Sequence, residues 1–229
     1  MKKLYILFLL MGLLSFSTMG RAAITEKLLT YQSYPSEEAL DQVLGKITVK
    51  MKNISKDQTT IVRQKEVEDK VINDEFVLDK DYSLKAWTRT SEEEDTDFSS
   101  ERVGDKLVIK GKINGEMIDK EIVLGSKLLY IYPKYSLSKF AMSNLGKIKF
   151  WTLRRDKMEK LLMKARKEGE ETIVVNGRDV DVIKVYYAIT GKLREKHYNH
   201  NYYYRKSDGL FVKKEDNKGR IEELVKEQY

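Results

Sequence analysis

Apolar and polar residues alternate with a period of two along much of the chain, which is the pattern of a strand that buries one face. The clearest example is segment 46–52, where Ile47, Val49 and Met51 alternate with Lys and Thr residues, and segment 106–110 repeats the pattern. Further segments with strand-like patterns are 59–66, 71–78, 82–90, 118–124, 147–153, 172–175, 180–188, 198–205 and 210–215. The pattern therefore predicts a protein that is mainly β.

Short turns connect these predicted strands. Three dipeptides combine a residue that tolerates positive φ with glycine: Asn114-Gly115, Asn176-Gly177 and Asp208-Gly209. Such pairs favour tight hairpins between neighbouring strands. Because parallel strands need long crossover connections, the short turns predict an antiparallel meander.

Two segments carry helical signals. Segment 36–44 begins with Ser36, has acidic residues in its first turn and places apolar residues at helical spacing, so it is predicted as a short helix. Segment 156–167 fits both a helical stripe and a strand face, and its local propensity favours a helix.

The start of the chain has a different pattern. Two lysines precede an apolar run over residues 4–14, and small and polar residues follow up to Ala23. This is the pattern of a secretory signal peptide, and the run is shorter than the ~20 apolar residues that a membrane-spanning helix needs. We expect cleavage after Ala22, or alternatively after Gly20. The expected product is a soluble periplasmic protein, without a transmembrane segment, in which residues 23–229 form a single antiparallel β domain.

Composition narrows the expected partners. The 229 residues contain no cysteine, so the chain can form neither a disulfide nor an acylated lipoprotein amino terminus. The formal charge is +7, from 43 Lys and Arg against 36 Asp and Glu, but no stretch gathers basic and aromatic residues into one stripe. We therefore expect no nucleic-acid partner.

The second half of the chain carries a resemblance to a known family. Segments 147–151 (KIKFW), 170–185 (EETIVVNGRDVDVIKV) and 203–215 (YYRKSDGLFVKKE) resemble exported bacterial proteins of unknown function whose fold is similar to the lipoprotein carriers LolA and LolB. The resemblance implies a strongly curved antiparallel sheet, a half-open β barrel, with one or two short helices. Residues 133–145 would form a plug or lid, and segment 156–167 would be the later part of a long strand.

Residues suited to catalysis or metal binding form no recognisable motif. His197 and His200 are the only histidines and would lie on opposite faces of a strand, without a nearby acid in their own segment. The acidic run 92–97 lacks the glycine-punctuated spacing of a calcium loop and is interpreted as solvated. No nucleophile motif or phosphate-binding glycine motif is present. We therefore predict no catalytic residue, no metal site, no cofactor and no enzymatic activity.

Apolar residues gather around the predicted lid. The candidate ligand-binding residues are Leu129, Ile131, Phe140, Met142, Leu145, Phe150 and Trp151. One interpretation is that they fill the core, as aromatic residues commonly do. The other is that they line a cleft for an acyl chain or an apolar polypeptide segment, with Lys134, Lys139 and Lys147 near its mouth to meet an anionic head group. The sequence leaves both interpretations open.

Three hypotheses for the function follow. The first is a noncatalytic periplasmic protein that binds a lipid or other apolar ligand in cell-envelope biogenesis. The second is an interaction or structural module that binds an envelope protein through a sheet edge, by strand addition. The third is a hydrolase, which ranks last because no pair of base and nucleophile is visible.

Overall fold

The computed structural model describes residues 26–55, 57–67, 70–191 and 195–229. The predicted signal peptide, residues 1–22, lies outside the described residues. Within them, 66% of residues are in strands, which confirms the prediction of a mainly β protein. None of the described helices combines the length and the apolarity that crossing a membrane requires.

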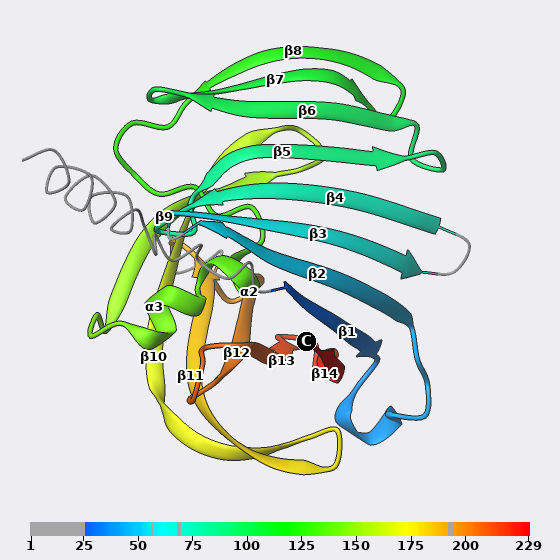
Figure 1. Ribbon diagram of the computed structural model, residues 1–229, viewed down its shortest axis with the longest axis vertical. Coiled ribbons are helices and arrows are strands. Elements are labelled where there is room, and N and C mark those ends of the chain that lie inside the picture. The colour runs from blue at the N-terminus through cyan, green and yellow to red at the C-terminus, as the bar shows by residue number, and fades with distance from the viewer. Residues whose placement is uncertain (1–25, 56, 68–69, 192–194) are drawn as a thin grey trace, which may run out of the picture.

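One open antiparallel sheet of 14 strands makes up the fold (Figure 1). Its first eight strands are β1 (Glu26–Tyr34), β2 (Gly45–Ser55), β3 (Gln58–Val67), β4 (Lys70–Asp79), β5 (Leu84–Ser91), β6 (Thr96–Val103), β7 (Lys106–Ile113) and β8 (Glu116–Val123). The other six are β9 (Lys147–Arg154), β10 (Glu159–Val175), β11 (Arg178–Ile189), β12 (Asn199–Arg205), β13 (Phe211–Asp216) and β14 (Ile221–Gln228).

The order of strands places β1, the first described strand, in the interior of the sheet. From edge to edge it is β8-β7-β6-β5-β4-β3-β2-β1-β14-β13-β12-β11-β10-β9. The chain thus builds one half of the sheet outward from β1, crosses to the far edge, and builds the other half inward until β14 pairs with β1. Among the described strands β8 and β9 are outermost and do not pair with each other, so the curved sheet stays open, as predicted.

The segment between β8 and β9, residues 124–146, is named the crossing segment. It lies inside the curve of the sheet (Figure 1). It contains two short helices, α2 (Pro133–Ser136) and α3 (Ser138–Met142). Before the helices, the segment bridges the two halves, because the Leu84 amide of β5 donates to the Leu129 carbonyl over 2.9 Å. On its other side the Trp151 amide of β9 donates to the Leu128 carbonyl over 2.9 Å. These bonds fix the segment between β5 and β9.

The glycine turns behave as the sequence predicts. Asn114, Gly115, Asn176 and Gly177 all have positive φ, at 50°, 84°, 47° and 72°. Gly209 (φ 70°) also allows α3 to approach, since a Cβ there would lie 2.7 Å from Met142 Cγ. Any other residue at position 209 would have to adopt a positive φ and displace the Met142 side chain.

The predictions for segments 36–44 and 156–167 need correction. Segment 36–44 forms only a 3-10 turn, η1 (Glu37–Ala39), and the Ser36 side chain caps nothing in the part of the chain that the structure describes. Segment 156–167 is in a long strand from Glu159 onward, as the resemblance implies and against its helical propensity, but it is the first part of that strand, β10, and not the later part. The preceding strand β9 ends at Arg154, a tight turn follows in which Met158 is buried with φ 45°, and β10 returns antiparallel to β9.

The core lies between the curved sheet and the crossing segment. Its largest buried side chain, Trp87 of β5, meets Phe98 edge-on at 4.6 Å and stacks on Phe76 at 5.9 Å between ring centroids. On the other half of the sheet Phe150 stacks on Tyr187 at 6.0 Å. These buried residues of the two halves belong to one apolar cluster.

Candidate functional site

A cleft of about 1510 Å³ opens on the inner side of the sheet, between strands of its two halves. Its apolar lining includes Ile47, Val67, Ile72, Phe98 and Ile113 from the first half and Leu153, Leu161, Met163, Tyr187, Ile189 and Tyr202 from the second half. The crossing segment contributes Ile131, Tyr132, Pro133 and Lys134. The cleft is therefore walled by both halves of the sheet and by the residues that enter α2.

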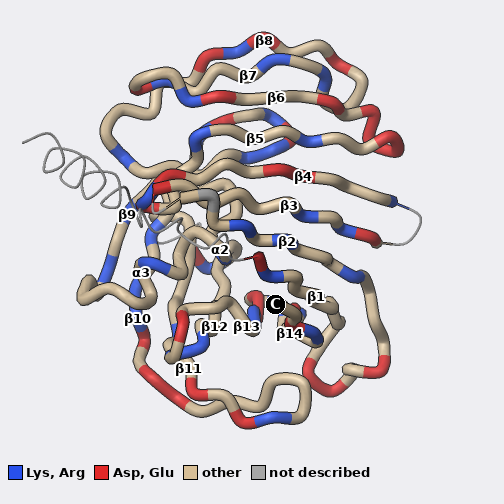
Figure 2. Tube along the Cα trace, viewed as in Figure 1, with Lys and Arg blue, Asp and Glu red and all other residues tan. Residues whose placement is uncertain are grey.

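The charged residues of the lining are mostly basic. They are the bases Arg63, Lys65, Arg89, Lys134, Arg154, Arg155, Lys214 and Arg220 and the acids Glu94, Asp156, Asp216 and Glu222. Over the sheet as a whole, basic and acidic residues are interspersed (Figure 2). The excess of positive charge is thus a property of the cleft, where apolar walls and cations occur together.

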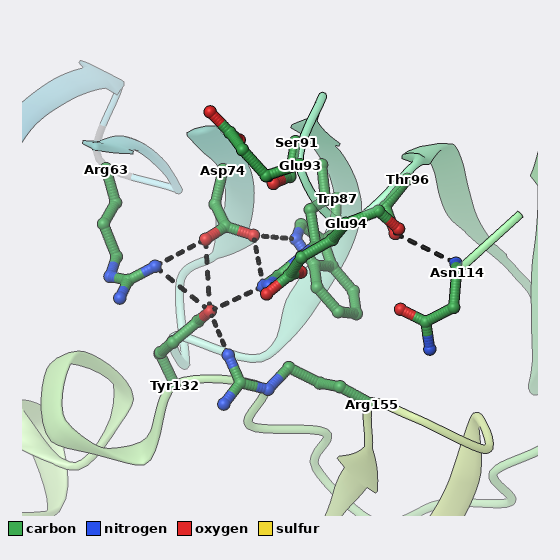
Figure 3. Close-up of polar contacts among 11 residues, drawn as sticks. Arg63, Asp74, Trp87, Ser91, Glu93, Glu94, Thr96, Asn114, Tyr132 and Arg155 are labelled. Carbon is green, nitrogen blue, oxygen red and sulfur yellow. Dashed lines mark hydrogen bonds and ion pairs between the residues drawn. The ribbon is translucent and has the colours of Figure 1, made fainter. Parts of the chain in front are cut away.

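Five residues at the cleft form a hydrogen-bonded group that we name the arginine cluster: Arg63, Asp74, Arg89, Tyr132 and Arg155. Asp74 accepts from Arg63 Nη1 over 2.6 Å and lies 3.4 Å from Arg89 Nη1. The Tyr132 hydroxyl donates to Asp74 Oδ2 over 3.1 Å and accepts from Arg155 Nη1 over 2.7 Å. Arg63 and Arg89 also reach this hydroxyl, over 3.3 and 3.4 Å. Figure 3 shows the side chains converging on Tyr132.

The period of the strands places this group inside the sheet. On β4 the buried positions are Ile72, Asp74, Phe76 and Leu78, so the carboxylate of Asp74 occupies a position in an apolar stripe. It is fully buried, and Trp87 Nε1 donates to it over 2.9 Å. A buried carboxylate is tolerated only when it is paired and hydrogen-bonded, and three donors besides Tyr132 meet this need.

The positive charges of the arginine cluster exceed its negative charges. Arg89 has a second partner, Glu94, over 2.9 Å, and neighbouring Lys65 adds one more cation. The pKa of Lys65 is lowered, first by burial and then by the charges of Arg63 and Arg155. Among the described residues, no ion pair joins Lys65 or Arg155 to a carboxylate, whereas Arg63 and Arg89 are paired.

A second part of the cleft is walled by stacked rings, which we name the aromatic wall: Tyr187 of β11 with His200 and Tyr202 of β12. The His200 ring lies 5.8 Å from Tyr187 and 5.9 Å from Tyr202, nearly parallel to both. Burial, followed by the charge of Lys214, lowers the pKa of His200 to about 3. Its Nδ1 is buried without a hydrogen-bond partner among the described residues. His200 is therefore a neutral ring at physiological pH and a weak base.

Beside the aromatic wall lies a buried ion pair between Lys134 of α2 and Glu222 of β14. The Lys134 ammonium also lies 5.2 Å from the Tyr135 ring and 5.6 Å from the Phe211 ring. Burial lowers the pKa of Lys134 to about 8, although Glu222 opposes this change. The pair connects the crossing segment to the strand that completes the sheet.

The predicted ligand-binding residues lie mostly in the core. Leu129, Phe140 and Phe150 are almost completely buried, whereas Met142 and Leu145 are 46% and 58% exposed. Trp151 is partly buried and donates from Nε1 to the Leu124 carbonyl over 2.9 Å. Ile131 lines the cleft, and it is the one residue of the predicted set that does so. A binding role stays a prediction for all seven residues.

Of the three lysines predicted near the mouth of the cleft, one lines it. Lys134 lines the cleft, but Lys139 donates to the Lys80 carbonyl and Lys147 is exposed on β9. The sequence reasoning missed the arginine cluster. A signal for it exists at Asp74, whose charge falls in phase with the apolar positions Ile72 and Phe76 on a strand that was correctly predicted.

No arrangement typical of a metal centre is found in the described residues: no three His, Asp or Glu side chains lie close enough to hold an ion. The acidic run 92–97 forms the turn after β5, where Glu94 pairs with Arg89 and Asp95 pairs with Lys112 over 2.7 Å. Two of its carboxylates thus neutralise neighbouring cations.

Comparison with known proteins identifies a similar fold. No protein-family model matches the sequence, and no curated protein matches it. A solved structure does: a beta-barrel-like protein of the domain of unknown function DUF1849 from Brucella abortus, with a TM-score of 0.57 and 12% identity. The match covers 89% of this chain and 97% of that one. At this identity the similarity shows a shared barrel-like fold and nothing about the ligand.

Proposed function

We propose that the protein is a noncatalytic binding protein of the cell envelope that holds a lipid or other apolar ligand in the open cleft. The observation that carries this proposal is the cleft of about 1510 Å³ with apolar side chains on both walls. Drug-sized ligands occupy pockets of ~300 to 1,000 Å³, so this space suits a longer molecule. The crossing segment lies between the two walls and is hydrogen-bonded to β5 and to β9.

The chemistry of the cleft supports binding rather than catalysis. A general base needs a pKa near the working pH, and the burial of His200 moves its pKa to about 3. The chain has no cysteine to serve as a nucleophile. Two buried ion pairs, Arg63 with Asp74 and Lys134 with Glu222, instead connect elements of the walls.

The envelope location rests on the amino-terminal pattern of two lysines and a short apolar run. Sequencing the amino terminus of the protein purified from its host tests this part. We expect the chain to begin at Ala23 or Arg21. An intact Met1 on a membrane-embedded form would refute it.

Binding of an uncharged apolar dye, Nile red, tests the cleft itself. Leu161 of β10 lines the cleft, whereas its neighbour Leu162 is equally half-buried but does not line it. Placing an amide in an apolar wall should weaken binding of Nile red about tenfold in Leu161→Gln, because the amide must be desolvated. Leu162→Gln is the matched control and should bind as the wild type does. Equal binding by both variants would refute a site in this cleft.

A lipid that co-purifies gives the second test. Protein prepared from its host without detergent is extracted with solvent, and the extract is examined by mass spectrometry. We expect one acyl species in near-stoichiometric amount from the wild type and less from Leu161→Gln.

An alternative function, binding an envelope protein by strand addition, is favoured by the unpaired edge at β8. Met117 on this strand is 81% exposed, although Glu116, Asp119 and Glu121 add charges that discourage unspecific pairing. Proline in place of Ile118 would block an added strand on the free side or break the pairing with Gly111 on the other. Loss of a co-purifying protein with unchanged dye binding would favour this alternative.

A further inference from the structure

We infer that the arginine cluster receives the anionic group, a carboxylate or a phosphate, of the ligand in the cleft, and that Arg155 and Lys65 contact it directly. This inference rests on the proposed function, since it concerns one end of the molecule that the apolar walls would hold. It adds a polar end to that ligand and so makes it an amphiphile.

The exposure of the arginines divides their roles. Arg63 and Arg89 are only 4% and 7% exposed, and both are engaged with Asp74. Arg155 is exposed, and within the described residues its guanidinium makes one side-chain hydrogen bond, from Nη1 to the Tyr132 hydroxyl. Because a guanidinium carries five N–H donors, Arg155 keeps donors available for the oxygens of a ligand. Tyr132 thus acts as a positioning residue that holds Arg155 over the cleft.

The charge balance favours an anion at this place. Four cations, Arg63, Lys65, Arg89 and Arg155, face two carboxylates, Asp74 and Glu94, both of which are already used by Arg63 and Arg89. Burial lowers the pKa of Lys65, and the positive charges of Arg63 and Arg155 lower it further by repulsion. A bound carboxylate or phosphate would relieve this repulsion, since opposite charges attract strongly in a partly desolvated site.

A second observation comes from unpaired polar atoms. Arg63 Nε is buried and has no hydrogen-bond partner in the described part of the chain. Buried donors are nearly always paired, so an orphan beside a cleft indicates a place for a ligand oxygen or a water molecule. The orphan and the charge excess occur on the same group of side chains.

The position of the arginine cluster relative to the apolar lining fits a single amphiphile. Ile72 of β4 and Phe98 of β6 line the cleft and flank the strand that carries Arg89. Leu153 precedes Arg155 by two residues and lines the cleft as well. A chain lying on these apolar side chains would place its charged end within reach of Arg155.

The experiment compares two probes that differ only in their end group. A pyrene-labelled fatty acid and the corresponding fatty alcohol are titrated against the full chain, by fluorescence, at low and high salt. We expect the acid to bind the wild type about 10- to 100-fold more tightly than the alcohol, as charged hydrogen bonds predict. High salt should reduce this preference.

Variants assign the preference to residues. Arg155→Gln and Lys65→Met should each remove most of the preference for the acid over the alcohol. Arg178→Gln, which alters an exposed arginine that does not line the cleft, is the matched control and should behave as the wild type does. Arg155 is exposed, so its replacement should leave the melting temperature unchanged.

The outcomes separate the inference from the proposed function. If both probes bind equally and Arg155→Gln changes neither, the cleft binds chains but the anion site is refuted. If neither probe binds, the proposed function fails and the inference fails with it. Inorganic phosphate is the third probe: binding that requires Arg155, without binding of either chain, would assign the site to a free anion and overturn the head-group assignment.

Discussion

The arginine cluster and the aromatic wall lie in one cleft and bury ionisable groups by different means. In the arginine cluster, four side chains donate to the buried carboxylate of Asp74 or lie at ion-pair distance from it. In the aromatic wall, His200 packs beside two tyrosines with its ring nearly parallel to both and stays neutral, because burial lowers its pKa to about 3. Neighbouring Lys134 keeps one carboxylate partner, and burial lowers its pKa to about 8.

This difference indicates which part of the protein should make its stability depend on pH. A charge that is fully hydrogen-bonded contributes stability across the neutral range, whereas a group whose charged form is penalised by burial makes stability depend on pH near its ordinary pKa. We therefore expect the arginine cluster to dominate the effects of mutation and the aromatic wall, with the Lys134–Glu222 pair, to dominate the effects of pH.

The largest effect should come from removing the centre of the arginine cluster. Asp74→Ala leaves the nearly buried Arg63 and Arg89 without their shared carboxylate and should cost about 3 to 5 kcal/mol of unfolding free energy. Urea denaturation followed by tryptophan fluorescence measures it. Glu121→Ala, which removes an exposed carboxylate paired with Lys106, is the control and should leave the transition in place. Equal effects of the two changes would remove the distinction between a structural cluster and surface pairs.

The next effect concerns acid. Since His200 has a folded pKa near 3 and an ordinary value of 6.5, the unfolded chain binds more protons between these limits. Stability should therefore fall as pH drops below 6.5, by about 1.4 kcal/mol per pH unit from this group. His200→Phe should keep the stacking and remove this part of the loss, measured by urea denaturation between pH 6.5 and 5. His197→Gln, at the other, exposed histidine, should retain the wild-type slope.

Base should act on Lys134 in the opposite range. Its folded pKa of about 8 lies below the ordinary 10.5, so the unfolded chain binds more protons between these values and stability rises with pH there. The difference in unfolding free energy between the wild type and Lys134→Met should move by about 1.4 kcal/mol in favour of the wild type from pH 8.5 to 9.5. In Glu222→Gln the rise should begin at lower pH, because the carboxylate that favours the charged lysine is gone. A constant difference would show that Lys134 is better paired than its burial implies.

The smallest effect is expected at the hydroxyl of Tyr132. Tyr132→Phe removes a hydrogen bond to Asp74 and the acceptor for Arg155, and should cost about 1 to 2 kcal/mol. If Tyr132 acts by positioning Arg155, a double-mutant cycle with Arg155→Gln should show coupling in the affinity for the fatty acid probe. Independent effects would mean that the hydroxyl only stabilises the cluster.

Most strands in which an apolar residue alternates with a more exposed one were predicted, but β1, with buried Leu29 and Tyr31, was not. β2, β4 and β7 follow this pattern and were found in the sequence. β6 and β14 escaped prediction for a physical reason: their inner faces carry polar side chains. Thr96 and Ser100 of β6 are buried beside Phe98, and Glu222 and Glu223 of β14 are buried in place of apolar residues. A period-two search for apolar residues does not recognise strands whose buried positions are polar.

The candidate site escaped prediction for a related reason. Arg63 and Arg89 lie on strands that were predicted correctly, but charged residues on a strand are ordinarily assigned to the solvent face. Their partner Asp74 lies on the neighbouring β4, and Tyr132 comes from the crossing segment, so their meeting depends on the register of three strands and on the bridge to β5. Neither the composition nor the residue spacing of the sequence indicates which residues of these strands lie opposite each other. Apolar residues near Pro133 were recognised, and most of them pack in the core.

The pairing of β1 with β14 joins the two halves of the sheet that wall the cleft. Leu28 lies opposite Gln228, whereas every other neighbouring pair of strands is adjacent in sequence. During synthesis the meanders β1–β8 and β9–β14 can each form from local hairpins, but they share no ladder until β14 emerges and docks on β1. Glu222, which pairs with Lys134 beside the aromatic wall, arrives on that same strand. We therefore expect a chain that lacks β14 to lack the complete candidate site, because its two half-sheets would share no ladder.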